Sequence, residues 1–430
     1  MISLGLDEVR RMAPGRLVAA AGATVITGVR IDSRRVEPGD LFVAVGRGAD
    51  FEADALGRGA AAVLLPDDAH AALATLARSV RERSSARVVG ITGSAGKTST
   101  KDILAALCRP HARTEASEGG HNNELGLPLT MLKTEDDTEV VIAEMGMRGL
   151  GEIAELCAIA RPDIGVITGV GPVHLELLGT VERVAEAKAE LVRALPSGGT
   201  AVVPAGATVL EPFLTRRDIE LVRFGEGGDV RLGRFRPPLL LAEVGGERVE
   251  LEVPFTSSHQ AENTLAALAA YRALGLPLAR AGEGAPGIAF SPWRGEESEL
   301  PGGVLVINDA YNANPDSMRA ALRHAQERAA GRRLVAVLGG MAELGEHAPR
   351  LHREVGWEAA RADVAVLVAV AELARGYLEA PIAERRHVDT PEEAIEQLRG
   401  LLRPGDVVLV KGSRAFALEG IAEALANVPA

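Results

Sequence analysis

The stretch that decides the fold is Val88-Val89-Gly90-Ile91-Thr92-Gly93-Ser94-Ala95-Gly96-Lys97-Thr98-Ser99-Thr100. Its apolar start predicts a buried β-strand, and the run 98–107 predicts a helix. A glycine-rich loop between a strand and a helix aims backbone N–H groups and the positive end of the helix dipole at an anion such as phosphate. In such a loop Lys97 would reach the β- and γ-phosphates of a nucleotide, and the Thr98 hydroxyl would hold Mg²⁺.

The loop is shorter than the full phosphate-binding pattern G-x-x-x-x-G-K-[ST], because Ile91 stands where that pattern has its first glycine. What remains is G-x-x-G-K-T over residues 93–98. A plain turn between strand and helix is the alternative, but the flanking elements favour a nucleotide site. The residues predicted to bind the phosphates of a nucleotide here are Gly93, Ser94, Ala95, Gly96, Lys97, Thr98 and Ser99.

Repeated strand–loop–helix units surround this stretch and predict an α/β protein with parallel sheets covered by helices. At 430 residues the chain is long enough for two or three domains. We predict three, over residues 1–83, 84–292 and 293–430. The segments 80–87 and 282–303, rich in small, polar or glycine and proline residues, are expected to be linkers.

The pattern also predicts the elements within each section. The N-terminal section is expected to be a small α/β domain with a helix at 6–12 and strands at 24–31, 41–45 and 61–65. The central section is expected to be a mononucleotide-binding parallel sheet domain with strands at 87–92, 139–144, 164–168 and 200–204, helices at 98–107, 151–160, 181–194 and 261–274, and short alternating strands at 230–254. The third is expected to be a Rossmann-like doubly wound domain with strands at 304–308, 333–339, 364–370 and 406–411 and helices at 315–328, 350–361 and 391–402.

Composition excludes several classes of function. The 47 basic and 59 acidic residues give a net charge of −12, which together with only 3% aromatic residues argues against nucleic-acid binding. No apolar run approaches the roughly 18 residues of a membrane span, and the N-terminus has no apolar signal-peptide core. Two cysteines, Cys108 and Cys157, are expected to be buried thiols, so we predict a protein of the reducing cytoplasm.

Glutamate and histidine side chains follow the next two predicted strands. Glu144 ends an apolar strand, where a second Mg²⁺ ligand is expected beside a phosphate loop, and a helix-capping acid is the alternative. His174 ends the run TGVGPVH after the following strand, and a structural histidine is the alternative. Because the carboxyl ends of parallel strands meet at one edge of a sheet, the combination favours a metal–nucleotide cleft.

Lysine and asparagine are scarce in this chain, with five and seven copies, which fits a GC-rich source, and the scarcity of thermolabile asparagine also fits a heat-adapted one. Lys188 lies in a predicted helix, where the alternative is a solvated lysine paired with Glu186 or Glu190. Neither acid is four residues away, so no helical ion pair is obvious. An amine can lose its proton and carry a carbamate, which a guanidinium cannot do, so a retained lysine indicates such chemistry.

Asparagines gather in two loops that suit a polar ligand, since an asparagine amide both donates and accepts hydrogen bonds. The loop 117–128 contains Asn122 and Asn123, with a turn as the alternative. The run NDAYNANP at 308–315 lies between a predicted strand and helix, with an N-cap turn as the alternative.

Together these motifs resemble the Mur ligases of peptidoglycan synthesis over nearly the whole chain. The short phosphate loop, Glu144, the GPVH run ending at His174, and Lys188 are similar to the ATP and Mg²⁺ site of that family. The resemblance implies ATP and two Mg²⁺ ions. It implies that Thr98 and Glu144 hold one ion, and that His174 and a carbamylated Lys188 hold the other.

Several further stretches resemble the branch of the family that adds D-alanyl-D-alanine. The run DAYNANPDSM at 309–318 is similar to its D-S-Y-N-A-N-P-x-S-M signature, and 118–128 is similar to its muramoyl-peptide loop. Residues 31–44 resemble the uridine-nucleotide domain of the family, and 338–345 and 410–414 also match it. The sequence departs from the family at Gly120, Gln260, Ala310 and in a shortened loop at Asp50-Phe51.

The same resemblance implies roles for individual residues. The catalytic residues would be Lys97, Glu144, His174 and Lys188. The nucleotide would also contact Asn263 at the adenine, Arg294 at the phosphates and Asp309 at the ribose. The other substrates would contact Ser33, Arg34, Asn122 and Asn123, and, on the dipeptide side, Tyr311, Asn312 and Asn314.

The expected activity is therefore that of an ADP-forming acid–amino-acid ligase. It would join D-alanyl-D-alanine to UDP-N-acetylmuramoyl-tripeptide through an acyl phosphate and give the UDP-linked pentapeptide precursor of peptidoglycan. We expect these two substrates as partners, no nucleic acid, and a monomer. Two alternatives stay open: an amide ligase similar to folylpolyglutamate synthase, and a nucleotide-binding regulator that has lost catalysis.

Overall fold

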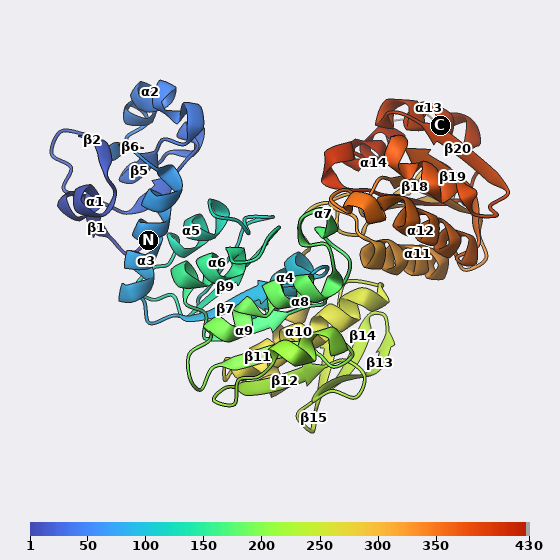
Figure 1. Ribbon diagram of the computed structural model, residues 1–430, viewed down its shortest axis with the longest axis horizontal. Coiled ribbons are helices and arrows are strands. Elements are labelled where there is room, and N and C mark those ends of the chain that lie inside the picture. The colour runs from blue at the N-terminus through green and yellow to red at the C-terminus, as the bar shows by residue number, and fades with distance from the viewer. Residues whose placement is uncertain (427–430) are drawn as a thin grey trace. The chain divides into compact units, whose positions relative to one another are not determined.

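The computed structural model describes residues 1–426 (Figure 1). These residues divide into two compact units. The first comprises Met1–Thr168, Glu186–Thr256 and Ala261–Ala289; the second comprises Gly169–Ala185, Ser257–Gln260 and the chain from Phe290 onward. Among the described residues, every helix is too short or too polar to cross a membrane. The α/β class predicted from the sequence is confirmed.

The N-terminal part of the first unit is a small α/β layer. Four strands pair in the order β2-β6-β5-β4, with β2 antiparallel to β6 and the other pairs parallel. The strands of this part are β1 (Leu4–Gly5), β2 (Gly15–Ala19), β3 (Val25–Ile26), β4 (Gly28–Arg30), β5 (Asp40–Val43) and β6 (Ala62–Pro66), and the helices are α1 (Leu6–Met12), α2 (Glu52–Gly57) and α3 (Ala69–Arg83).

Helix α3 corrects the linker predicted at 80–87, because the helix continues to Arg83 and strand β7 begins at Arg87. Leu73, Leu76 and Val80 are buried at helical spacing, which supplies the apolar face that the arginine-rich composition obscured. Arg81 at the end of the helix donates from Nε to the carbonyl of Ala160 at 2.9 Å. The segment is therefore a packed helix end followed by a short connection.

A nine-stranded sheet forms the rest of the first unit, in the order β15-β14-β13-β12-β11-β10-β7-β9-β8. The strands from β12 to β8 are parallel, which confirms the predicted central parallel sheet, and β13 to β15 form an antiparallel meander. The strands are β7 (Arg87–Thr92), β8 (Thr114–Ala116), β9 (Val140–Glu144), β10 (Ile164–Ile167), β11 (Thr200–Pro204), β12 (Glu220–Phe224), β13 (Val230–Arg236), β14 (Leu239–Val244) and β15 (Glu247–Glu252).

Of the helices that accompany this sheet, the short helix Gly126–Met131 is not among those predicted and the helix predicted at 181–194 is divided, whereas the others begin and end close to their predicted positions. The helices are α4 (Lys97–Cys108), α5 (Gly126–Met131), α6 (Glu152–Ala160), α9 (Glu190–Ala194) and α10 (Ser258–Ala273). The single helix predicted at 181–194 is wrong: it is divided into α8 (Val181–Lys188) and α9 by an interruption at Ala189. The interruption follows Lys188 directly.

The second unit is built on a six-stranded sheet in the order β16-β17-β21-β18-β19-β20. All pairs are parallel except β16 with β17, which confirms the predicted doubly wound sheet. Its elements are β16 (Glu296–Leu300), β17 (Val304–Asn308), β18 (Leu334–Gly339), β19 (Val364–Val370), β20 (Glu384–Val388), β21 (Val407–Lys411), α7 (Leu175–Leu178), α11 (Pro315–Ala329), α12 (Ala348–Arg361), α13 (Pro391–Leu401) and α14 (Glu419–Ala426).

Helices cover both faces of this sheet, with α11 and α12 on one face and α13 and α14 on the other (Figure 1). Alternate strand residues such as Val335, Val337 and Val368 pack with Leu398 of α13, as the two-residue period of a strand requires. Strand β16 corrects the second predicted linker, 282–303. Its residues are largely exposed because it is an edge strand, so no apolar alternation marks it in the sequence.

Gly356 in α12 is expected to be required for packing inside the second unit. A Cβ atom there would lie 2.6 Å from the Tyr377 carbonyl oxygen and 2.8 Å from the Tyr377 Cα, both backbone atoms. We expect Gly356→Ala to lower the free energy of unfolding by about 1–3 kcal/mol, as overpacking does. The measurement is denaturant unfolding of the full chain.

The matched control is Gly400→Ala in α13, where an added Cβ meets nothing within 4 Å. This change is expected to be neutral or to stabilise by about 0.5–1 kcal/mol, because glycine is the more flexible residue in the unfolded chain. Equal effects of the two substitutions would contradict the packing argument.

Candidate active site

The phosphate loop has the geometry that the sequence predicts. Strand β7 ends at Thr92, and α4 begins at Lys97 after Gly96, which adopts a left-handed φ of 82°. A Cβ atom at Gly96 would lie 2.4 Å from Asn263 Oδ1, so the loop also needs glycine there to fit against α10. The loop and the predicted adenine-side residue Asn263 are therefore neighbours in the first unit.

Lys97 and Thr98 lie where the first turn of α4 faces the loop. Lys97 Nζ donates to the Gly93 carbonyl at 2.8 Å, so its ammonium group curls back over the loop. Thr98 and Ser99 are 1% and 4% exposed, respectively. Thr168, at the end of β10, donates from Oγ1 to the Ala95 carbonyl and fixes the loop from the neighbouring strand.

Glu144 ends strand β9 directly beside the phosphate loop, because Glu144 is the register partner of Ile91. The side chain is 1% exposed, and Oε1 accepts a hydrogen bond from Asn122 Nδ2 at 2.8 Å. Within residues 1–426 the other oxygen, Oε2, is buried and has no hydrogen-bond partner. A buried carboxylate oxygen of this kind is costly unless a cation binds it, so Glu144 could hold Mg²⁺.

Asn122 joins the loop 117–125, named the substrate loop for its predicted contact with the muramoyl peptide, to this carboxylate through two contacts. Besides the side-chain bond to Glu144, its carbonyl accepts from Gly146 N at 2.7 Å. Asn123 has a local role instead, because its Oδ1 accepts from the backbone N–H of Gly126 at 2.9 Å at the start of α5. Of the two adjacent asparagines, the structure therefore brings only Asn122 to the predicted metal ligand.

Lys188 is buried in the first unit, with 2% exposure. Burial, and secondarily the nearby Lys97 ammonium, lowers the pKa of the Lys188 amine well below its ordinary value. Within the described residues, no carboxylate forms an ion pair with it. Lys188 is therefore suited to be a neutral amine rather than a solvated cation, which excludes the alternative interpretation made from the sequence.

Glu190, one of the two acids considered as a partner for Lys188, is used elsewhere. Its carboxylate oxygens accept from Gly151 N at 2.7 Å and Ala154 N at 3.0 Å, which caps the first turn of α6. The interruption at Ala189 separates Glu190 from the helix that carries Lys188. This capping role is a structural function that the sequence pattern did not reveal.

The predicted uridine residues lie in the N-terminal part of the first unit. Ser33 is buried, whereas the Arg34 side chain is largely exposed and donates from Nε and Nη2 to Asp32 at 2.9 and 2.7 Å. The Arg34 hydrogen bonds lower the pKa of Asp32 to about 2. The pair holds the turn Ser33–Arg35 and presents a guanidinium group to solvent.

In the second unit, Asp309 is fixed by Lys411. Strands β17 and β21 are neighbours, and Lys411 Nζ lies 2.6 Å from Asp309 Oδ2 and 3.0 Å from the Asn312 carbonyl. Lys411 is 2% exposed, so this is a buried, fully bonded ammonium. His259 is partly buried near Asp309, and desolvation lowers the pKa of His259 to about 4.

The remaining predicted residues of the second unit surround the same strand end. The Arg294 guanidinium carbon lies 3.8 Å from the centroid of the Tyr311 ring, a cation–π contact. Asn314 caps α11, because its Oδ1 accepts from Ser317 N at 2.9 Å. Asn312 accepts locally from Ala313 N at 2.9 Å. The structure therefore gives two of the predicted dipeptide residues backbone-supporting roles.

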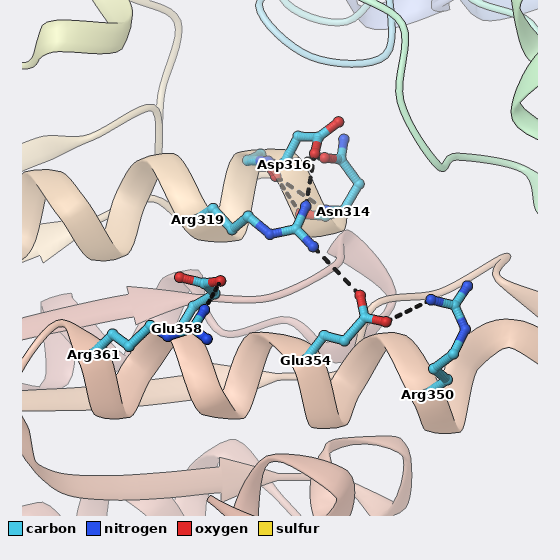
Figure 2. Close-up of polar contacts among 8 residues, drawn as sticks. Asn314, Asp316, Arg319, Arg350, Glu354, Glu358 and Arg361 are labelled. Atoms are coloured by element: carbon cyan, nitrogen blue, oxygen red, sulfur yellow. Dashed lines mark hydrogen bonds and ion pairs between the residues drawn. The ribbon is translucent and has the colours of Figure 1, made fainter.

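An ion-pair chain next to Asn314 ties α11 to α12 (Figure 2). Arg319 lies 2.9 Å from Asp316 and 3.5 Å from Glu354, and Glu354 pairs in turn with Arg350. Burial raises the pKa of Asp316. These ion pairs connect α11 to α12, its neighbour on the same face of the sheet.

His174 belongs to the second unit, where it contacts Glu343. Its Nδ1 lies 2.7 Å from Glu343 Oε2, an ion-pair distance without hydrogen-bond geometry, and both residues have left-handed φ values of 53° and 62°. A carboxylate at one ring nitrogen leaves the other free to bind a metal ion. Because Lys188 lies in the first unit, the pairing of these two residues at one ion stays a prediction.

Known proteins resemble the chain over its whole length. The Mur ligase middle domain matches residues 91–271, and the Mur ligase, glutamate ligase domain, matches residues 293–414. The UDP-N-acetylmuramoyl-tripeptide–D-alanyl-D-alanine ligase of Mycobacterium tuberculosis is 36% identical, over 99% of this chain and 98% of the relative.

Two solved structures extend this comparison. MurF from Acinetobacter baumannii has a TM-score of 0.88 at 27% identity, with 99% of both chains covered. The MurF ligase of Thermotoga maritima in complex with ADP has a TM-score of 0.79 at 30% identity, with 93% of this chain and 96% of that chain covered.

The chain therefore belongs to the Mur ligase family. Its sequence relatives along the full length are ligases named for the addition of D-alanyl-D-alanine to UDP-N-acetylmuramoyl-tripeptide.

Glu144→Gln tests the unpartnered carboxylate oxygen. Glutamine keeps the oxygen that accepts from Asn122 and removes the negative charge. In metal-free buffer we expect a midpoint of thermal unfolding equal to or above that of the unchanged protein, since a buried charge without a partner is costly. Mg²⁺-dependent turnover should fall by about 100-fold or more.

The matched control is Glu115→Gln on the neighbouring strand β8, a partly buried acid whose carboxyl pKa is raised by burial. It should leave Mg²⁺ dependence unchanged. Normal Mg²⁺ activation of Glu144→Gln would argue against Glu144 as a metal ligand.

Proposed function

We propose that this chain joins D-alanyl-D-alanine to UDP-N-acetylmuramoyl-tripeptide with conversion of ATP to ADP and phosphate. The observation that carries the proposal is the buried Glu144 carboxylate, which lies beside the phosphate loop and binds Asn122 of the substrate loop. The names of the full-length relatives, and the ADP complex of the T. maritima relative, support these substrates.

The side chains at the site fit divalent cations. Thr98 and Glu144 would hold one Mg²⁺ ion, and His174 with carbamylated Lys188 would hold the other. Oxygen and imidazole donors match this assignment, and the unpartnered Glu144 Oε2 is the structural reason for it. When bound, Mg²⁺ neutralises charge on the phosphate oxygens.

Carbamylation of Lys188 would use the neutral amine that burial favours. The nitrogen lone pair forms a bond to the carbon of CO₂, and one N–H proton leaves to solvent, which gives an anionic carbamate. The Lys97 charge, which repels an ammonium at position 188, would attract this carbamate. A single modification would thus turn an unfavourable charge environment into a favourable one.

The two chemical steps need positioning and charge stabilisation more than acid–base chemistry. A carboxylate oxygen of the tripeptide attacks the γ-phosphorus as the bond to ADP breaks, which gives an acyl phosphate. Lys97 and the N–H groups of the loop stabilise the transferring phosphoryl group. The neutral dipeptide amine, bound near Tyr311 and Asn312, then attacks the carbonyl carbon, its nitrogen loses a proton to solvent, and phosphate leaves from the tetrahedral intermediate to give the amide.

The alternatives drawn from the sequence are less well supported. A folylpolyglutamate synthase-like ligase is not favoured, because the relatives that span the chain are D-alanyl-D-alanine ligases. An inactive regulator would not need a buried amine at Lys188 or an unpartnered acid at Glu144.

Both cysteines are buried free thiols, as expected in the cytoplasm. The monomeric state stays a prediction.

Phosphate release tests the proposed function. The purified chain with MgATP should release phosphate only when UDP-N-acetylmuramoyl-tripeptide and D-alanyl-D-alanine are both present. Tripeptides that differ at the third residue would identify the preferred substrate. Turnover with folate and glutamate instead, or none with either pair, would contradict the proposal.

Lys188 variants test the carbamate. Lys188→Arg keeps a positive charge but cannot form a carbamate, so we expect turnover to fall by about 100-fold or more. Lys188→Ala should be inactive and should recover partly when a small carboxylate such as formate or acetate is added to the assay. Full activity of Lys188→Arg would exclude the carbamate.

A further inference from the structure

The root of the substrate loop is held by a buried lysine that the sequence motifs leave without a role. The loop 117–125 connects β8 to α5 and carries Asn122. Lys101 Nζ donates to the carbonyl of Ser117, the first loop residue, at 2.7 Å. Lys101 lies one helical turn after Lys97 on α4, so the helix that begins at the phosphate loop also holds the substrate loop.

Ser117 is a junction between three elements. Its Oγ accepts from the backbone N–H of Glu144 at 3.0 Å and from Thr130 Oγ1 of α5 at 3.1 Å. Its own N–H donates to the Ile142 carbonyl of β9 at 3.0 Å. Because Ser117 is 2% exposed and bonded on every polar atom, a shift of this residue would move both Glu144 and the loop that carries Asn122.

Lys101 is placed at some cost. Lys101 is 3% exposed, and its Nζ lies 2.8 Å from Asp102 Oδ1. The Asp102 side chain is itself only 12% exposed. Burial of such a pair is weak evidence for a gain in stability, because desolvation of the charges offsets their attraction. A role that needs the geometry of the ammonium group explains its presence better.

We propose that Lys101 is a positioning residue that, through Ser117, fixes the Glu144 carboxylate and Asn122 relative to the phosphate loop. The inference rests on the proposed function, since it assigns Glu144 to Mg²⁺ and Asn122 to the substrate loop. A ligand displaced by even a fraction of an ångström binds its ion less well, and supporting bonds around metal ligands commonly contribute 10–100-fold in affinity.

The measurement is ADP affinity with and without Mg²⁺, by calorimetry on the full chain. In Lys101→Met we expect ADP affinity with Mg²⁺ to weaken by about 10-fold or more, while ADP affinity in the presence of a chelator stays within about 2-fold. In turnover assays the Mg²⁺ concentration for half-activation and the KM for the UDP substrate should rise. The KM for D-alanyl-D-alanine should stay unchanged.

Loss of Lys101 leaves the Asp102 carboxylate buried beside a neutral residue, which alone could destabilise the chain. The double variant Lys101→Met/Asp102→Asn removes that charge. It should regain thermal stability and keep the weakened Mg²⁺-dependent ADP binding. Ser117→Ala deletes the hydroxyl that accepts from Glu144 N and from Thr130 Oγ1. It should weaken Mg²⁺-dependent ADP binding as well, and it provides the test if the double variant does not fold.

Lys133→Met is the matched control. Lys133 pairs with Glu118, the residue next to Ser117, but this pair is partly exposed and should contribute little. The Lys133→Met variant should have an affinity for MgADP within about 2-fold of that of the unchanged protein.

Unchanged Mg²⁺-dependent ADP binding in a folded Lys101 variant, or in Ser117→Ala, would overturn the inference even if the enzyme is active. Failure of the unchanged protein to bind MgADP, or to release phosphate, would instead reject the proposed function on which the inference rests.

Discussion

The first unit is organised around two ionisable side chains that are buried without an oppositely charged partner among the described residues. Glu144 keeps one carboxylate oxygen without a hydrogen bond, and burial together with Lys97 holds the Lys188 amine toward its neutral form. Each arrangement is unfavourable in the free protein, since a buried charge or polar group without a partner is costly. In the proposed function, a divalent cation would satisfy Glu144 and a carbamate on Lys188, so metal binding would offset the cost of burying these two groups.

The surrounding fold supports these two groups from a distance. Parallel pairing of β7 with β9 sets Glu144 next to the phosphate loop, and Ser117 holds the Glu144 backbone from β8. Glu190 caps α6 instead of neutralising Lys188. The Glu190 bonds stabilise α6 and also withhold this carboxylate from Lys188.

The second unit also contains a deeply buried lysine, but this one has bonding partners. Lys411 is as deeply buried as Lys188, but Asp309 and the carbonyl of Asn312 satisfy its ammonium group. Asn314 caps α11, and Arg319 and Glu354 join that helix to α12 (Figure 2). The strand end is therefore held by its own bonds, as the proposed role in orienting a dipeptide amine would require.

The sequence by itself determined the α/β class, most element positions, the phosphate loop and the neighbourhood of Glu144, because strand–loop–helix periodicity and the meeting of parallel strand ends are local or topological properties. It could not separate α8 from α9 at Ala189 or detect the exposed edge strand β16, since neither leaves an apolar pattern. Only the tertiary structure decided that Lys188 is buried, that Asn122 and not Asn123 reaches Glu144, and that Lys101 holds Ser117. These facts depend on contacts between segments far apart in the chain, and the spacing of residues within one segment carries no information about them.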